Sequence, residues 1–187
     1  MTRAGQLRHL LSQDSLVVAP GAYDGMTARL VEQHGFPAVY MTGAGTAATL
    51  GYPDYGLVTQ TEMVDNAARM ADAVSIPLIA DADTGYGNEL NVTRTVRAYE
   101  GRGVAAIHLE DQVMPKRCGH LDGKELQPVE AFITNIRAAV AARRNPDFLI
   151  IARTDARAVL GFEAAIERAN AALAAGADMA FVEAPQT

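Results

Sequence analysis

An α/β fold built on a parallel sheet is predicted by three features of this 187-residue sequence. Short apolar runs alternate with longer stretches of helical period, the runs are almost wholly apolar, and polar residues follow each of them. Strands that are apolar throughout are typical of a parallel sheet whose two faces are covered by helices. The two architectures of this kind are the doubly wound open sheet and the (β/α)8 barrel.

Six short apolar runs are predicted to form the strands, because they are rich in β-branched and aliphatic residues. In chain order they are Leu16–Ala19, Ala38–Met41, Pro77–Ala80, Ala105–Leu109, Phe148–Ala152 and Met179–Val182. Polar residues and glycines separate them, so no segment approaches the roughly 18 consecutive apolar residues of a membrane span. We therefore expect neither a membrane-spanning segment nor a membrane partner.

Helices are predicted between the strands, because apolar residues recur there at intervals of three and four. Their apolar faces are Met63, Val64, Ala67, Met70, Ala71 and Val74, then Val92, Val96 and Tyr99, then Ile133, Ile136 and Val140, then Ile166, Ala169 and Leu173. Thr59 followed by Glu62 predicts a capping box at the start of one helix. Gly35, Gly103 and Gly176 stand where the left-handed residue that ends a helix is expected.

The positions of polar residues favour a barrel over an open sheet. Ligands of an open sheet gather at one switch point, whereas the loops after all the strands surround the site of a barrel. Polar residues follow every predicted strand, namely Tyr23 and Asp24, Thr42, Asp81 and Asp83, Glu110 and Asp111, Arg153 and Asp155, and Glu183. We therefore expect an α/β fold of the (β/α)8 TIM barrel type.

The number of predicted strands is too small for a complete barrel. Such a barrel needs eight strands and about 250 residues, and only six β/α units are recognised here. Residues 1–187 are therefore expected to form a single barrel domain that is incomplete at its C-terminus. The two remaining units would belong to a longer natural product or to another chain.

The composition favours a protein that acts on small molecules. Hydrophobic residues make up 49% of the chain and charged residues 20%, which is typical of a globular domain with a sizeable core. The formal net charge of −6 opposes binding to nucleic acid or to an anionic membrane. The single cysteine cannot form an internal disulfide and no signal peptide is evident, so a reducing, cytoplasmic location is expected.

Two carboxylates end one predicted strand, and a third ends the next. Asp81 and Asp83 share a face with Ile79, because side chains alternate along a strand, so two negative charges meet at the barrel mouth. Glu110 ends the following strand. Three oxygen ligands beside an open site suit Mg²⁺ or Mn²⁺ that is held partly through water. The alternative is that these acids cap helices or pair with Arg153.

Arg153 shares a face with Ile151 and Asp155 by the same alternation. A guanidinium binds a carboxylate through two hydrogen bonds, so beside a metal it would hold a di- or tricarboxylate. The alternative is a structural ion pair with Asp155 or Glu183. The turn of small residues at 42–46 would in addition let backbone N–H groups approach an anion closely.

Cys118 lies in a polar stretch beside Lys116, Arg117 and His120. Positively charged neighbours favour the thiolate form of a cysteine. Cys118 is therefore a candidate acid or base on a mobile loop. The alternative is an inert buried cysteine, which is the commoner role of this residue type.

Four motifs, in this order along the chain, resemble the isocitrate lyase and phosphoenolpyruvate mutase superfamily. They are Asp-Ala-Asp-Thr-Gly-Tyr-Gly at 81–87, His-Leu-Glu-Asp-Gln at 108–112, Lys-Arg-Cys-Gly-His at 116–120 and Ala-Arg-Thr-Asp-Ala at 152–156. The resemblance runs from about residue 16 to 187 and is strongest to the 2-methylisocitrate lyase and 2,3-dimethylmalate lyase group. It implies a (β/α)8 barrel with a helix swapped between subunits, a homo-oligomer that is usually a dimer of dimers, and one Mg²⁺ per site.

The resemblance also implies a role for each matched residue. Mg²⁺ would be bound, directly or through water, by Asp81, Asp83 and Glu110, with Asp54 as a more distant partner. A small carboxylate substrate would be bound by Thr42, Gly43, Ala44, Gly119, His120, Arg153 and Glu183. Catalysis would rest on Cys118, Arg153, Glu110 and Tyr40. Ala44 departs from the family pattern, because many of its lyases have a third consecutive glycine there.

The loop cysteine separates the reactions of this family on physical grounds. When a 2-hydroxy di- or tricarboxylate is cleaved to a 2-oxo acid and a carboxylate, a thiol can protonate the carbanion that forms. The phosphoryl migration of a phosphonate-forming phosphoenolpyruvate mutase needs no such proton donor. We therefore expect a Mg-dependent carbon–carbon lyase for a substrate like 2-methylisocitrate or 2,3-dimethylmalate. The alternatives are an oxaloacetate hydrolase or decarboxylase, the mutase, and a non-catalytic fragment.

Overall fold

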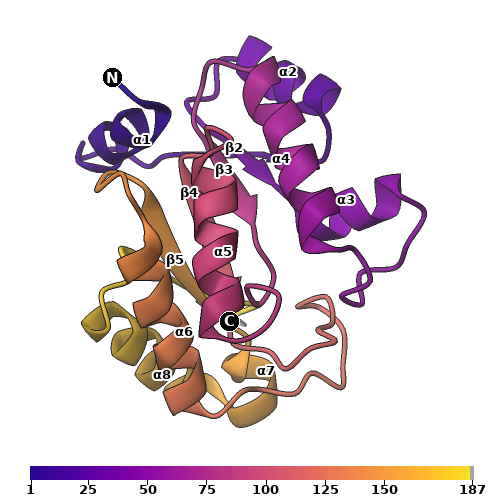
Figure 1. The fold of residues 1–187 in the computed structure, drawn as a ribbon, viewed down its shortest axis with the longest axis vertical. Coiled ribbons are helices and arrows are strands. Elements are labelled where there is room, and N and C mark those ends of the chain that lie inside the picture. Colours follow the sequence, from indigo (N-terminus) through magenta and orange to yellow (C-terminus); the bar gives the residue numbers. More distant parts are fainter. Residues whose placement is uncertain (186–187) are drawn as a thin grey trace.

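The computed structural model describes residues 1–185, and within them six parallel strands form one sheet (Figure 1). The strands are β1 (Gly21–Ala22), β2 (Val39–Met41), β3 (Leu78–Asp81), β4 (Ala106–Glu110), β5 (Leu149–Thr154) and β6 (Met179–Val182). Each strand pairs with the next one along the sequence. A doubly wound sheet would reverse its strand order at a switch point. The observed order is therefore that of a (β/α)8 barrel, and it confirms the predicted fold class.

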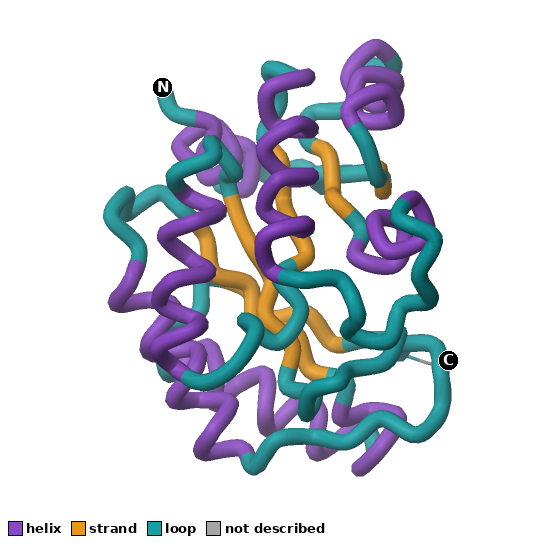
Figure 2. The backbone as a smooth tube through the Cα atoms, turned by 45° about the vertical axis from the view of Figure 1, so that its right-hand side comes forward, coloured by secondary structure: helices purple, strands orange, loops and turns teal. Residues whose placement is uncertain are grey.

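The helices lie outside the strands, which run through the middle of the molecule (Figure 2). They are α1 (Arg3–Leu11), α2 (Gly25–Gln33), α3 (Gly43–Thr49), α4 (Gln60–Ala73), α5 (Glu89–Glu100), α6 (Val129–Ala142), α7 (Ala156–Leu160) and α8 (Phe162–Ala174). The first of them, α1, packs Ala4 and Leu7 against Ala38, Ala105 and Leu149 at the start of the strands. In the described part of the chain, no helix has the length and apolar character that crossing a membrane requires.

The helix boundaries follow the local signals in the sequence. The Thr59 N–H donates to Glu62 Oε2 at 2.8 Å and the Thr59 hydroxyl accepts from the Glu62 N–H, which confirms the capping box of α4. Gly35, Gly103 and Gly176 have φ values of 81°, 78° and 107°, as expected for residues that follow a helix. The predicted apolar faces of α4 and α5 are buried in the main core.

The first predicted strand is wrong in its position. Leu16 is 89% exposed, and pairing with β2 begins only at Pro20, whose carbonyl accepts from the Tyr40 N–H at 3.0 Å. The run Leu16–Ala19 instead connects α1 to β1. Apolar composition marks a segment as suited to a sheet, whereas the strand itself is defined by backbone pairing with its neighbour.

The predicted buried face of α8 is correct at Ala169 and wrong at its two larger residues. Ala165, Ala169 and Ala172 are buried, whereas Ile166 and Leu173 of the predicted face are exposed. Alanines let the helix backbone lie close to β5 and β6, with which α8 packs. Ile166 and Leu173 lie on the adjacent face of the helix. The hydrophobicity of the side chains alone therefore did not identify which residues of α8 are buried.

The pairing register brings the chemically interesting residues to one end of the sheet. Asp81 at the end of β3 is paired with His108 of β4, and Glu110 at the end of β4 is paired with Arg153 of β5. Because all strands are parallel, their carboxyl ends meet at the same side of the fold. This end of the sheet therefore collects the acids and the arginine that the sequence singled out.

We expect Ile107→Ala to lower the free energy of unfolding by about 2–5 kcal/mol, because the shorter side chain leaves a cavity at a fully buried position of β4. Ile107→Val should cost about 0.5–1.5 kcal/mol. Leu90→Ala on the exposed side of α5 is the control and should change stability by less than about 0.5 kcal/mol. Urea denaturation followed by circular dichroism measures all three, and equal losses for Ile107→Ala and Leu90→Ala would contradict the assignment of the core.

Candidate active site

A cavity of about 350 Å³ opens at the carboxyl ends of the strands. It is lined by Tyr40, Thr42, Ala44, Asp54, Asp81, Lys116, Cys118, Gly119, His120, Arg153, Phe181 and Glu183. Most of the residues singled out in the sequence therefore lie around one space. Three others, Gly43, Asp83 and Glu110, are buried next to it and do not line it.

Both carboxylate oxygens of Asp81 accept hydrogen bonds from backbone N–H groups. Its Oδ1 accepts from the Asp83 N–H at 2.9 Å, and its Oδ2 accepts from the Gly43 N–H at 3.1 Å. Burial alone would raise the pKa of Asp81, but the positive charges of a protonated His108, of Lys116 and of Arg153 lower it to about 2. Asp81 is therefore ionised at neutral pH.

The pKa of Asp83 is shifted in the opposite direction by the same surroundings. Burial, followed by the negative charge of Asp81, raises the pKa of Asp83 to about 6, although Lys116 acts against this rise. Asp83 adopts a φ of 47°, a left-handed conformation that Asp tolerates better than most residues. Two acids that are two residues apart are thus separated in proton affinity, which is typical of functional sites.

Lys116 places its ammonium group between two carboxylates. Its Nζ lies 2.6 Å from Asp54 Oδ1, as a hydrogen bond, and 2.8 Å from Asp83 Oδ1, as an ion pair without hydrogen-bond geometry. Burial disfavours the charged amine, but the surrounding acids raise the pKa of Lys116 above its usual value. The sequence did not predict this contact, because 62 residues separate Lys116 from Asp54.

His108 lies beneath the cavity in contact with Tyr40. The two rings stack with centroids 5.6 Å apart, and the Tyr40 hydroxyl lies 2.6 Å from His108 Nε2. Phe181 packs edge-on against the imidazole. Burial lowers the pKa of His108 to about 4, against the opposing effect of Asp81. His108 is therefore neutral at physiological pH.

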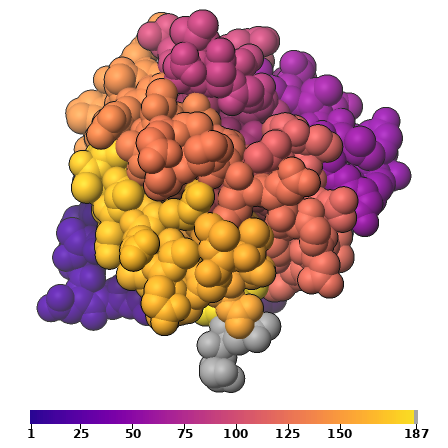
Figure 3. Space-filling model, turned by 90° about the horizontal axis from the view of Figure 1, so that it is seen from below, coloured from indigo at the N-terminus to yellow at the C-terminus, as the bar shows by residue number. Residues whose placement is uncertain are grey.

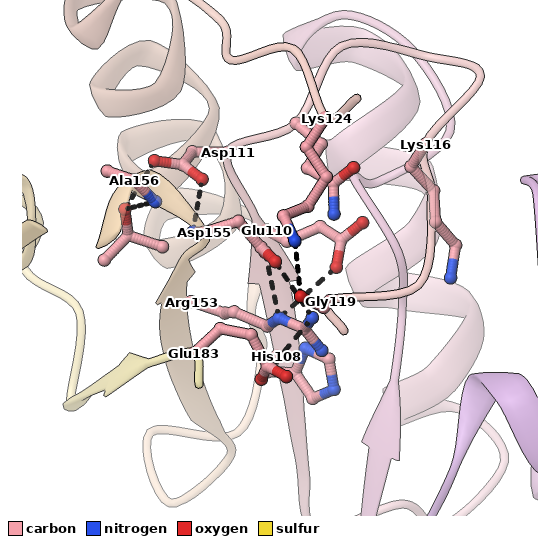
Figure 4. A network of polar contacts seen from close by, with 12 residues as sticks. His108, Glu110, Asp111, Lys116, Gly119, Lys124, Arg153, Asp155, Ala156 and Glu183 are labelled. Carbon is pink, nitrogen blue, oxygen red and sulfur yellow. Dashed lines mark hydrogen bonds and ion pairs between the residues drawn. The ribbon is translucent and has the colours of Figure 1, made fainter. Parts of the chain in front are cut away.

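Arg153 is surrounded by three carboxylates (Figure 4). Its Nε lies 3.1 Å from Asp155 Oδ2 and 3.4 Å from Glu110 Oε2, and its Nη2 lies 3.5 Å from Glu183 Oε2. The guanidinium also lies over the ring of Phe181, 5.4 Å from the centroid. The structural ion pairs that the sequence offered as an alternative are thus present, while the same side chain lines the cavity.

The loop that carries Cys118, residues 112–124, covers the cavity. The Cys118 N–H donates to the Asp54 carbonyl at 3.1 Å, and Figure 3 shows this part of the chain packed against the segment that contains Asp54. A side chain at Gly119 would collide with Arg153 and Glu183. A larger residue at this position would therefore require the ends of these two side chains to move.

Several predicted binding groups are already engaged within the protein. The Gly43 N–H donates to Asp81, and the Thr42 hydroxyl accepts from the Gly45 N–H at 3.3 Å as the N-cap of α3. Asp24, one of the polar residues that follow the strands, caps α2. A substrate carboxylate at the turn 42–46 would therefore have to find other donors than the Gly43 amide.

The acids fit a metal only as a loose set of oxygen donors. Among the described residues, no three carboxylates, histidines or cysteines form a ready ligand group. Glu110 Oε1, however, is buried without a hydrogen-bond partner, and Asp83 Oδ1 has only its ion pair with Lys116. Carboxylate oxygens suit Mg²⁺, which usually keeps several waters and takes one or two protein ligands. The donor chemistry fits that ion.

We expect the His108 imidazole to stay neutral until the pH falls to about 4. Because its pKa lies below the ordinary 6.5, the unfolded chain binds the proton first as the pH falls. The stability that depends on neutral His108 is therefore present above pH 6.5 and lost between about 6.5 and 4. Imidazole nitrogen shifts in an NMR titration measure the pKa, with His108→Gln to assign the signal, and a midpoint near 6.5 would contradict it.

Comparisons with known proteins identify the relatives of this chain. A model of the phosphoenolpyruvate phosphomutase family matches residues 7–187. All of the chain aligns, at 55% identity, with 2,3-dimethylmalate lyase of Eubacterium barkeri, of which it covers 65%. It superposes on oxaloacetate acetylhydrolase in complex with 3,3-difluorooxalacetate with a TM-score of 0.96 and 49% identity, over 100% of this chain and 65% of that one.

A third relative was solved with a metal ion. It is phosphonopyruvate hydrolase in complex with oxalate and Mg²⁺, at a TM-score of 0.92 and 38% identity, over 100% of this chain and 64% of that one. The chain thus spans slightly less than two thirds of the length of each of these three relatives. Together with the family match, the fold and the motifs around the cavity, these likenesses establish that the chain belongs to the PEP mutase/isocitrate lyase superfamily.

Proposed function

We propose that the protein is a lyase that cleaves a carbon–carbon bond of a 2-hydroxy di- or tricarboxylate such as 2,3-dimethylmalate or 2-methylisocitrate. The observation that carries the proposal is that Cys118 lines the same cavity as Arg153 and Asp81. A thiol in that position can deliver a proton to a carbon atom of a substrate that the guanidinium holds. The 55% identity to a 2,3-dimethylmalate lyase supports the same reaction.

Arg153 is the group that we expect to bind the substrate carboxylate. A guanidinium offers two parallel donors to a carboxylate and stays charged at every physiological pH. Of its ion pairs, the one with Glu183 is the longest, at 3.5 Å, and Glu183 also lines the cavity. We infer that the substrate carboxylate approaches the guanidinium on the Glu183 side. The volume of about 350 Å³ is sufficient for a small polycarboxylate.

Asp81, Asp83 and Glu110 are the residues that would hold Mg²⁺, directly or through water, with Asp54 farther out. The ion supplies positive charge for the oxyanions that develop during cleavage. The unpartnered Glu110 Oε1 supports this assignment, and Asp83 Oδ1 has the ion pair with Lys116 but no hydrogen bond. Mn²⁺ has similar ligand preferences and is expected to substitute for it.

Residues that line the cavity can supply both proton transfers that the cleavage requires. The proton of the 2-hydroxyl passes to a carboxylate, for which Glu183 is the acid that lies next to Arg153. The electron pair of the O–H bond forms the carbonyl of the 2-oxo acid as the C2–C3 bond breaks. The electron pair of that bond remains on C3 as an enolised carboxylate, stabilised by positive charge. The Cys118 thiol protonates C3, and the proton on Glu183 returns to the thiolate through solvent.

Tyr40 and His108 define the floor beneath these groups. Burial and the surrounding acids raise the pKa of Tyr40 well above its usual value, so its hydroxyl stays protonated. In the tautomer in which His108 Nε2 donates to it, the hydroxyl can donate to a substrate oxygen. The neutral His108 behind it adds no positive charge that would compete with Arg153 for the substrate carboxylate. We therefore assign Tyr40 to substrate positioning.

Oxaloacetate hydrolysis is the second candidate function. The likeness to oxaloacetate acetylhydrolase, at a TM-score of 0.96 and 49% identity, favours it as a competitor. Both reactions would use the same arginine and the same acids, because both break a carbon–carbon bond next to a carbonyl or hydroxyl carbon of a small dicarboxylate. The two functions are distinguished by their products, which are a 2-oxo acid and a carboxylate for the lyase, and acetate and oxalate for the hydrolase.

Assembly and location stay predictions for this chain. The family resemblance implies a homo-oligomer, usually a dimer of dimers, and the composition favours the cytoplasm. Both concern the whole protein, and the chain covers 65% of the dimethylmalate lyase.

We expect the protein with Mg²⁺ to form pyruvate from 2,3-dimethylmalate or 2-methylisocitrate, or glyoxylate from isocitrate. Proton NMR of the protein incubated with these three hydroxy acids and oxaloacetate identifies each oxo acid together with its partner acid. EDTA should abolish the reaction. Formation of acetate from oxaloacetate in the proton spectrum, with oxalate detected by carbon-13 NMR, would instead assign the hydrolase function. The lyase proposal fails if none of the three hydroxy acids is cleaved.

Replacing Cys118 by Ala should lower kcat for cleavage by at least about 100-fold, the lower limit for a lost general acid. KM should change little, because the thiol acts on the carbon that accepts the proton and not on the carboxylate that is bound. Met114→Ala, in the same loop and exposed, is the control and should keep full turnover. Unchanged turnover in Cys118→Ala would remove the thiol from the mechanism and favour a reaction without a carbanion to protonate.

A further inference from the structure

The backbone turn at 118–121 sets the position of the only thiol in the chain. The Leu121 N–H donates to the Cys118 carbonyl at 2.9 Å and closes this turn. Next to Cys118, Gly119 lies against Arg153 and Glu183, and His120 Nε2 lies 3.7 Å from Glu183 Oε1. A displacement of the turn would therefore move the thiol away from the guanidinium.

Lys124 is tied to the outer side of this turn. Its Nζ donates to the carbonyls of Gly119 and Leu121, the second at 2.8 Å. Figure 4 shows the Lys124 side chain pointing toward Gly119, with Arg153 and Glu183 beyond. The two carbonyls belong to the Gly119–His120 and Leu121–Asp122 peptide units, so one ammonium group binds the backbone on both sides of the His120–Leu121 peptide bond.

The burial of Lys124 calls for a physical reason. The residue is only 8% exposed. Lys116, the other lysine, pairs with Asp54 and Asp83, whereas in the described chain Lys124 has backbone carbonyls and no carboxylate as partners. Burying a charge without an opposite charge is costly, and hydrogen bonds to a charged donor are about twice as strong as neutral ones. We therefore expect these two bonds to contribute to the local conformation alongside the backbone bonds of the turn.

We propose that Lys124 is a positioning residue that holds the turn 118–121 closed over Arg153 and Glu183 and thereby sets the location of the Cys118 thiol. Lys124 lies outside the cavity and acts through the carbonyls of Gly119 and Leu121. The consequence for catalysis rests on the proposed function, in which Cys118 is the proton donor. The effect on the position of the thiol does not depend on it.

The reactivity of Cys118 toward a thiol reagent tests the proposal without any substrate. Since the chain has one cysteine, 5,5′-dithiobis(2-nitrobenzoate) reports on this turn alone. We expect Lys124→Met to raise the modification rate by at least about tenfold, which corresponds to about 1.4 kcal/mol. Lys124→Arg, which keeps the charge and the donors, should restore most of the protection. Circular dichroism and urea denaturation verify that each variant is folded.

Arg117→Met is the matched control. It removes one positive charge from the same loop, but Arg117 is exposed and its Nη1 donates to the Asp122 carbonyl outside the turn. Its modification rate should stay within about threefold of the wild type, a change of less than about 0.7 kcal/mol. An equal increase in Lys124→Met and Arg117→Met would overturn the proposal, because the increase would then not depend on the two bonds that Lys124 makes to the turn. An unchanged rate in Lys124→Met would overturn it as well.

Amide hydrogen exchange in the wild-type protein tests the closed turn without relying on a variant that folds. The Cys118 N–H donates to the Asp54 carbonyl, and the Leu121 N–H donates to the Cys118 carbonyl. We expect them to exchange with solvent at least about tenfold more slowly than those of the exposed neighbours Asp122 and Gly123, a difference of about 1.4 kcal/mol. Equal exchange at all four amides would contradict a closed turn.

Turnover distinguishes the failure of this proposal from the failure of the proposed function. If the protein is a lyase, Lys124→Met should lower kcat at least about tenfold with little change in KM, and Lys124→Arg should recover most of it. If no substrate is cleaved but Lys124→Met still exposes the thiol, the positioning role stands and the lyase function fails. If cleavage occurs and neither thiol reactivity nor kcat changes in Lys124→Met, the positioning role fails alone.

Discussion

Compensation of buried charge is the constraint on which the carboxyl end of the sheet depends. Removing an ion from water costs several kcal/mol unless an opposite charge and hydrogen bonds replace the solvent. Arg153 meets this cost with Glu110, Asp155 and Glu183, and Lys116 meets it with Asp54 and Asp83. The acids and the cations come from different strands and loops. The fold and the site therefore form together, since neither set of charges could be buried without the other.

The same compensation differentiates groups of one chemical type. Asp81 and Asp83 are two residues apart, yet the pKa of one is lowered to about 2 and that of the other is raised to about 6. Asp81 receives two backbone N–H bonds, whereas Asp83 faces the charge of Asp81. A site with one permanently ionised acid and one acid near neutrality can both hold positive charge and exchange protons.

The loop 112–124 is held by polar contacts to a larger extent than by apolar packing. The Lys116 ammonium group ties it to Asp83, the Cys118 amide ties it to the Asp54 carbonyl, and Lys124 closes it on itself. Val113, Met114 and Leu121 of this loop are exposed. The position of this loop therefore depends on charge pairing and hydrogen bonds, and the hydrophobic core beneath it contributes little.

The sequence by itself determined the alternation of strands and helices, the capping box at Thr59, and the residue types that surround the cavity, because these depend on local periodicity and on motifs within a few residues. It placed Asp81, Glu110 and Arg153 at strand ends, where the structure has them. Only the tertiary structure decided that β1 begins after Pro20, that Lys116 lies between Asp54 and Asp83, and that Lys124 closes the turn at Cys118. Strand pairing and long-range ion pairs depend on distances in space between segments far apart in the chain, and no local pattern encodes them.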